Sequence, residues 1–280
     1  MIRDTTLGAR LWIIAVWAVI GFFILNLLAM IAAVVVSSFA TRWLGTWFPI
    51  GWTTRWYTSA WNEFQLDEVL IVTFQVVFLV VFLSGLLGVP AAYAMARRDF
   101  PGKKLVMLLF LLPLLVPPIT FGIPLATVLY RTGLAGSMSG VVLANLVPTI
   151  PFVVLVMIPF VEQIDRRVED AARVFGAGTF QLFRYVLVPL LLPGILAALL
   201  LVLVRTIAMF ELTFLTAGPT SQTLVVALYY AVFASGVRSV QSIDAMAVVY
   251  MITTLVWLLI ALRFVNPTQI VARAKSEHAH

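Results

Sequence analysis

Six long runs of apolar residues constrain this 280-residue chain more than any other feature of its sequence. A helix that crosses a bilayer needs about 20 predominantly apolar residues, because its backbone N–H and C=O groups must pair with each other once water is excluded. A window of that length predicts spans at 11–36, 69–96, 105–129, 141–161, 190–216 and 243–264. The chain is 62% hydrophobic and 11% charged, a balance far from that of soluble domains. The sequence therefore predicts an all-α integral membrane protein with six transmembrane helices.

An even number of spans places both termini on one side of the membrane, and the basic residues indicate which side this is. Thirteen of the 18 Lys and Arg residues share the face that holds the termini: Arg3, Arg10, Arg97, Arg98, Lys103, Lys104, Arg166, Arg167, Arg173, Arg184, Arg263, Arg273 and Lys275. The opposite face holds Arg42, Arg55, Arg131 and Arg238, and Arg205 lies within a span. Because Lys and Arg accumulate in cytoplasmic loops, both termini and the connection 163–194 are predicted to be cytoplasmic.

Local composition predicts three departures from a simple six-helix chain. Four prolines in the third span, Pro113, Pro117, Pro118 and Pro124, predict a kinked or interrupted helix. The apolar segment 221–234 is too short to cross the membrane, so a buried or interfacial helix is expected there. Five tryptophans, Trp43, Trp47, Trp52, Trp56 and Trp61, crowd the first outer connection. Anchoring in the headgroup layer is the favoured interpretation, and docking of an external partner is the alternative.

The sequence also excludes several kinds of chemistry. It contains no cysteine, which excludes disulfides, thiolate catalysis and cysteine-ligated metal sites. Its two histidines, His278 and His280, lie in the C-terminal tail and are interpreted as solvated residues, so no metal site is expected. The sequence has no glycine-rich phosphate loop followed by Lys and Ser or Thr, so this chain is not expected to bind ATP.

The charged connection 163–194 contains a predicted helix at 165–175. Apolar residues recur at Ile164, Val168, Ala171 and Phe175, and charged residues occupy the other side. Gly176 and Gly178 predict a stop, and Thr179 is expected to cap a second short helix that leads to Pro189. A helix lying on lipid is one interpretation. The adjacent alanines and the mixture of acidic and basic residues favour an element that docks on a protein partner.

The spacing of this connection resembles a known signature. Asp170-Ala171-Ala172 is followed by three residues, Gly176, nine further residues and the ending Val186-Leu187-Val188-Pro189. This pattern resembles the cytoplasmic loop of permease subunits of type I ABC importers, with aspartate in place of the motif glutamate and valines at both aliphatic positions. The resemblance covers a MetI-like core at 69–264. Residues 1–68 would then be an added helix with a tryptophan-rich periplasmic loop, and 265–280 a cytoplasmic tail.

The resemblance implies a subunit that forms half of a solute path in the bacterial inner membrane. Its loop helix would be a coupling helix between the fourth and fifth spans, seated in a cytoplasmic ATPase. Implied contact residues are Asp170, Ala171, Ala172, Gly176 and Ala177, with Pro189 ending the motif and Glu169 a candidate for pairing with an ATPase arginine. The implied partners are an ATPase dimer that uses ATP and Mg, a second homologous permease, an external solute-binding protein and the bilayer, and no nucleic acid. No cofactor is expected on this chain.

Polar residues within the spans are candidates for the path of the cargo. They are Arg205, Glu211, Gln75, Asn145, Tyr229 and Tyr230. Arg205 is expected about 22 Å into the fifth span, where structural pairing is favoured over a role with substrate or as a gate. Glu211 is six residues further on and is expected on a different face from Arg205.

Two further stretches, 210–230 and 266–273, are similar to permeases of the polyamine and opine branch. A small polar organic cargo is therefore expected, with a sugar or ferric ion as the alternative. An ion-coupled secondary transporter is the rival class, and it is disfavoured because the sequence has no convincing internal repeat. A membrane-embedded enzyme and a channel are disfavoured as well, since the sequence offers neither clustered catalytic residues nor a filter motif.

Overall fold

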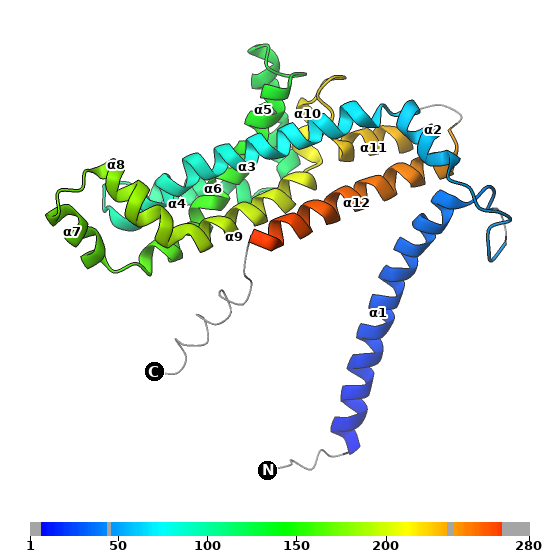
Figure 1. Cartoon of the computed structure of the whole chain (residues 1–280), viewed down its shortest axis with the longest axis horizontal. Coiled ribbons are helices and arrows are strands. Elements are labelled where there is room, and N and C mark those ends of the chain that lie inside the picture. Colours follow the sequence, from blue (N-terminus) through cyan, green and yellow to red (C-terminus); the bar gives the residue numbers. More distant parts are fainter. Residues whose placement is uncertain (1–6, 44–45, 234–237, 265–280) are drawn as a thin grey trace. The chain divides into compact units, whose positions relative to one another are not determined.

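The computed structural model describes residues 7–43, 46–233 and 238–264, and these residues are mainly helical (Figure 1). The elements in chain order are α1 (Leu7–Phe39), α2 (Arg55–Glu63), α3 (Leu66–Arg97), α4 (Lys103–Leu115), α5 (Pro118–Arg131), α6 (Met138–Glu162), α7 (Arg166–Val174), α8 (Thr179–Gln181), the π-helical turn η1 (Leu182–Leu187), α9 (Val188–Ile207), α10 (Glu211–Thr216), α11 (Leu224–Phe233) and α12 (Val240–Phe264). Arg3, Arg273, Lys275, His278, His280 and the predicted tail 265–280 lie outside the described residues.

Five stretches of helix in the described part of the chain are long and apolar enough to cross a membrane. They are Leu11–Phe39, Leu66–Arg97, Met138–Glu162, Thr179–Ile207 and Val240–Arg263. The sixth predicted span is the pair α4 and α5, which is bent by 103°. The predicted all-α membrane fold is confirmed. The segment at 221–234 forms the short apolar helix α11, as expected.

Prolines explain the break in the third span. Val116 precedes Pro117 and has the extended backbone, with ψ of 134°, that a following proline favours. Pro117 and Pro118 also lack the N–H groups that a continuous helix needs. The helix therefore ends at Leu115 and restarts at Pro118 in a new direction, which confirms the predicted interruption. With 13 residues, α4 is about 20 Å long and cannot cross a bilayer alone.

The fifth span begins and ends earlier than the predicted 190–216. One helical stretch runs from Thr179 to Ile207, and a break at Ala208–Phe210 separates it from α10. The boundaries were wrong because the apolar composition continues through the break, so hydropathy does not mark the end of the helix. Arg205 consequently lies in the last turn of α9. It is about 39 Å from the start of the helix at Thr179, instead of near mid-span.

The larger compact unit comprises Leu66–Tyr230 and the chain from Ile252 onward. In this unit α3, α6 and α9 pack together (Figure 1), and α6 is central because 61% of its most apolar window is buried, against 28% for α3. Glycines permit this close packing. A Cβ atom on Gly88 would lie 2.7 Å from Val153, and one on Gly194 would lie 2.6 Å from the ring of Phe160.

The second unit comprises the chain up to Gln65 together with Ala231–Met251. Its elements are joined by polar contacts. The Trp56 Nε1 donates to the Ala40 carbonyl at 2.7 Å, the Ser38 and Tyr57 hydroxyls are 2.8 Å apart, and Arg238 Nε lies 3.2 Å from Glu63 Oε1. Trp56 thus has a structural role, whereas Trp47 is 94% exposed. Headgroup anchoring by the other tryptophans and the predicted boundaries 1–68, 69–264 and 265–280 stay predictions.

Candidate functional site

The helix α7 begins and ends where the sequence predicts. Asp165 caps its start, because the Asp165 Oδ1 accepts a hydrogen bond from the Arg167 N–H at 2.9 Å. Gly176 ends it with φ of +85°, a left-handed conformation that favours glycine. The second cap was assigned wrongly. Gly178 is the N-cap of α8 and Thr179 is its first residue, because the Gln181 side chain satisfies the Gly178 N–H at 3.0 Å.

One side of α7 buries an acidic residue. Glu169 is 4% exposed, and its Oε1 lies 2.7 Å from Arg97 Nε of α3. The Tyr93 hydroxyl of α3 donates to Glu169 Oε2, and Arg173 Nη2 lies 3.7 Å from the same oxygen. The expectation that Glu169 faces a partner protein is corrected here, because its carboxylate is buried against α3 and held by groups of its own chain.

The opposite side of α7 exposes apolar side chains. Phe175, the C-cap residue, is 90% exposed and Val174 is 85% exposed. The carboxylate of Glu169 thus faces its own chain, whereas Val174 and Phe175, at the C-terminal end of the helix, expose apolar side chains beside the charged residues of α7. Exposed apolar groups of this kind mark an interaction surface.

The remaining residues of the loop signature divide between these two sides. Asp170, Ala171, Gly176 and Pro189 are exposed, whereas Ala172 and Ala177 are half-buried. Ala172 packs against the core formed by α3, α6 and α9. The exposed small residues therefore lie beside the apolar face of α7, and the half-buried ones seat the helix on the rest of the chain.

A cavity of about 360 Å³ lies behind α7, where the chain passes from α6 and where α9 approaches. Its lining residues are Phe160, Gln163, Ile164, Asp165, Val168, Leu190, Pro193 and Gly194. The packing of α7 against α6 and α9 is thus incomplete on this side, whereas its polar contacts with α3 are close.

Arg205 and Glu211 form no ion pair with each other within the described residues, and they lie on the separate helices α9 and α10 instead of on two faces of one helix. The Arg205 guanidinium lies 5.5 Å from the centre of the Phe152 ring, and among the described residues it forms no ion pair. Glu211 is half-buried and forms no hydrogen bond or ion pair within the described chain. Four aromatic side chains from the first part of α10 and the middle of α11 form one group, in which neighbouring ring centres are 4.9–5.9 Å apart. They are Phe210, Phe214, Tyr229 and Tyr230.

The other two polar candidates lie elsewhere. Asn145 is fully buried, and its Nδ2 donates to the Val141 carbonyl at 2.9 Å and to Thr213 Oγ1 at 3.2 Å. It therefore joins α6 to α10 inside the packed core of the chain. Gln75 lies on an exposed face of α3. The structure brings Tyr229 and Tyr230 together beside α10, and leaves Gln75 and Asn145 outside that group.

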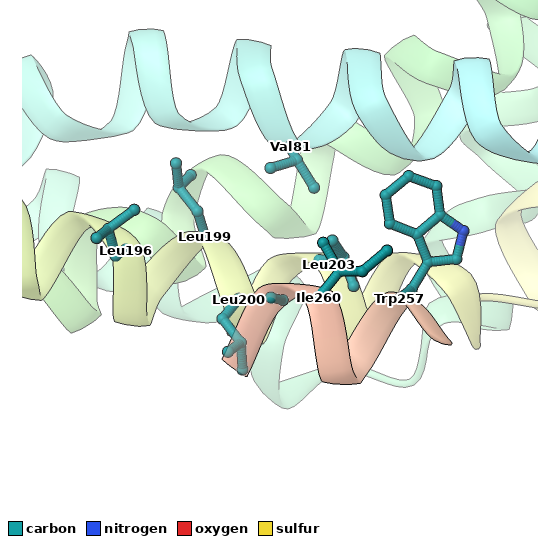
Figure 2. Close-up of a pocket in the computed structure, with 8 residues that line it drawn as sticks. Val81, Leu196, Leu199, Leu200, Leu203, Trp257 and Ile260 are labelled. Atoms are coloured by element: carbon teal, nitrogen blue, oxygen red, sulfur yellow. The ribbon is translucent and has the colours of Figure 1, made fainter. Parts of the chain in front are cut away.

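An apolar groove of about 200 Å³ lies between α3, α9 and α12 (Figure 2). Its lining residues are Val81, Leu196, Leu199, Leu200, Leu203, Trp257, Ile260 and Ala261. The Trp257 indole carries the one polar side-chain group among them, so the groove has too few hydrogen-bonding groups for a polar solute. The described residues contain no cluster of three or more His, Cys, Asp or Glu side chains suited to a metal ion.

Comparisons with known proteins agree with this architecture. Residues 85–271 match the family described as binding-protein-dependent transport system inner membrane component. The molybdenum transport system permease protein ModB of Haemophilus influenzae is 34% identical over 160 residues, covering 51% of this chain and 69% of that protein. The diacetylchitobiose uptake system permease protein NgcG of Streptomyces coelicolor is 30% identical over 149 residues, covering 53% of this chain and 49% of that protein.

The fold is also similar to that of a solved transporter. A bacterial ABC transporter involved in the import of the acidic polysaccharide alginate has a chain that superimposes with a TM-score of 0.77 and 17% identity, covering 94% of this chain and 99% of that chain. At this identity the likeness concerns the fold.

Proposed function

Because the chain belongs to the family of binding-protein-dependent transport system inner membrane components, the permease subunits of ABC importers, we propose that it forms half of a solute path and couples to a cytoplasmic ATPase through α7. The observation that carries this proposal is the apolar surface that α7 exposes at its C-terminal end. Phe175 and Val174 are among the most exposed apolar side chains of the described chain, and both lie at the end of a short helix outside the predicted spans. A protein partner that covers them would remove this surface from water.

The partner that fits this position is a cytoplasmic ATPase, and two copies would serve the two permeases of a complete importer. ATP and Mg are used by that ATPase, and this chain is a transport subunit without its own enzymatic activity or cofactor. In the proposed assembly a second homologous permease completes the path and an external binding protein delivers cargo, with no nucleic acid involved. Both termini then lie in the cytoplasm, on the inner side of the bacterial inner membrane.

Closure of the ATPase dimer would displace α7 and switch the packed helices between inward-facing and outward-facing states. Such rigid-body transitions are a common way in which packed helices move between discrete arrangements. Transport requires that the affinity for cargo differs between the two states, since otherwise no work is transferred to the solute.

For the cargo, we propose a small polar organic solute such as a polyamine or opine. Glu211 supports this proposal because its half-buried carboxylate has no partner in the described chain, and it lies beside Phe210 in the group of four rings. Carboxylates and aromatic faces both attract cationic amines. A sugar is the second candidate, because NgcG is named for uptake of a sugar and aromatic rings also suit hydroxylated solutes. Arg205, Tyr229 and Tyr230 are the other proposed path residues, whereas Asn145 is assigned to structure.

A double substitution in the loop tests the docking of α7. Ala171→Leu with Gly176→Val, both at exposed positions, should abolish co-purification with the ATPase and abolish uptake, while membrane insertion is retained. Gly133→Val is the matched control, because Gly133 has φ of +71° and, as at Gly176, an added Cβ would meet nothing within 4 Å. Uptake can be followed with putrescine and diacetylchitobiose as probes. Normal co-purification of the double variant would refute docking through α7.

A further inference from the structure

Two residues of α3 hold α7 from one side. Tyr93 and Arg97 are one helical turn apart, so they lie on the same face of α3. The Tyr93 hydroxyl donates a hydrogen bond to Glu169 Oε2, and Arg97 Nε lies 2.7 Å from Glu169 Oε1. The Arg97 guanidinium also donates to the carbonyl of Ile164, just before α7 begins.

We propose that Tyr93, Arg97 and Glu169 form a joint that makes α7 and α3 move as one body, and that these three are positioning residues for the coupling of ATP hydrolysis to transport. This inference rests on the proposed function of α7 as the ATPase contact. We refer to the three residues as the α3–α7 joint. The Arg97 and Glu169 side chains are only 10% and 5% exposed, so water weakens their ion pair little.

The joint is the main polar attachment of α7. Within the described residues, the side-chain hydrogen bonds and ion pairs that connect α7 to a transmembrane helix all go to Tyr93 and Arg97 of α3. Toward α6 and α9, by contrast, α7 borders the cavity of about 360 Å³. Because α7 also packs on η1, a push on the exposed face of α7 would reach η1 by packing and α3 through the joint.

A second contact of Tyr93 extends the joint to the next element. Its ring meets the ring of Phe183 edge-on, with centres 5.2 Å apart and planes at 81°. Phe183 lies in η1, at the cytoplasmic start of the fifth helical stretch. Tyr93 thus connects α3 both with α7 and with the helical segment that follows it.

At its other end α3 contacts the region of the proposed cargo path. Thr73 Oγ1 accepts a hydrogen bond from the Leu224 N–H at 2.8 Å, where α11 begins. Tyr229 and Tyr230 follow on the same helix. Thr73 and Arg97 are 24 residues apart on one continuous helix, about 36 Å. A displacement of the joint along the axis of α3 would therefore reach α11, so α3 is suited to connect the ATPase contact with the aromatic group.

Charge exchange tests the joint in the complete importer, reconstituted in proteoliposomes with its ATPase and binding protein. The measured quantity is the stimulation of ATP hydrolysis by the purified binding protein, which reports coupling without knowledge of the cargo. Glu169→Arg or Arg97→Glu alone should lower that stimulation about tenfold or more, because each leaves like charges buried together. The double variant should recover to within about threefold of the unmodified importer, since neighbouring residues are energetically coupled.

Two further variants complete the experiment. Tyr93→Phe keeps the ring contact with Phe183 and removes the hydroxyl. It should retain ATPase binding and lower the stimulation. If the charge variants fail to assemble, this variant alone tests the joint. Asp99→Asn is the control, because Asp99 forms an exposed pair with Lys103 at the same end of α3. It should leave the stimulation unchanged.

The results separate this inference from the proposed function. Failure of the unmodified chain to bind the ATPase would refute the proposed function itself. Two results would overturn the joint and leave ATPase docking standing. One is that Tyr93→Phe binds the ATPase and shows full stimulation. The other is that all charge variants assemble and the double variant shows no more stimulation than the single ones. A loss of thermal stability in the variants with unchanged stimulation would likewise show that the three residues only support the fold.

Discussion

Replacing Phe175 with alanine should weaken the binding of the ATPase strongly and leave the permease folded. The Phe175 side chain is 90% exposed, so nearly all of its surface is available to a partner. Complete burial of a phenylalanine side chain stabilises by about 1.5–3 kcal/mol, and nine tenths of that is about 1.4–2.7 kcal/mol. Since about 1.4 kcal/mol corresponds to a factor of ten in Kd, Phe175→Ala should raise the Kd about 10- to 100-fold.

The assay is a titration of nanodisc-embedded permease with its purified ATPase, with Kd taken from the binding curve. Phe22→Ala is the matched control, because Phe22 is 71% exposed on α1, within the first predicted span. It should leave the Kd unchanged. Because Phe175 makes few contacts within its own chain, its removal should not lower the melting temperature. A Kd for Phe175→Ala within about threefold of the Phe22→Ala value would mean that the ring is not buried by the ATPase, and the argument from its exposure would fail.

Two further predictions concern the packing of the spans. Asn145→Leu should change the free energy of unfolding by about 1 kcal/mol or less, because interhelical hydrogen bonds in membranes contribute about 0.6 kcal/mol on average and the Asn145 Oδ1 has no partner among the described residues. The apparent KM for cargo should not change, and a raised KM at unchanged thermal stability would restore Asn145 to the path. Gly88→Ala should lower the melting temperature, because the added Cβ would lie 2.7 Å from Val153, and overpacking costs about 1–3 kcal/mol. Gly21→Ala on α1, where a Cβ meets nothing within 4 Å, is its control, and equal melting temperatures of the two variants would contradict close packing of α3 on α6.

The spans and the interruption in the third of them were predictable because their causes are local. Apolar runs of sufficient length leave the backbone no alternative to helix in lipid. The residue before a proline is pushed out of the helical region whatever surrounds it, so Pro117 and Pro118 predict the break between α4 and α5. The stop at Gly176 followed from the same kind of reasoning, since glycine readily adopts a left-handed backbone.

The end of the fifth helix and the depth of Arg205 were not predictable in this way. Met209 and Leu212 are as apolar as the helix before them, and both are buried by neighbouring elements. The break at Ala208–Phe210 therefore depends on tertiary packing, which hydropathy does not report. For the same reason the sequence could not distinguish Asn145, which joins α6 to α10, from a residue that lines a path.

The loop signature located α7, but it did not separate the roles of its two neighbouring acids. Consecutive residues on a helix point about 100° apart, so Glu169 and Asp170 have different surroundings. Glu169 is buried against Tyr93 and Arg97, whereas the Asp170 side chain is 70% exposed and lies 3.4 Å from Arg173. Asp170, at the position of the motif glutamate, is thus the acid that an ATPase could contact, and Glu169 is the acid that fastens the helix to its own chain. A polar pattern alone gives both carboxylates the same outward interpretation, because the partner that buries Glu169 is 72 residues away in the sequence, at Arg97.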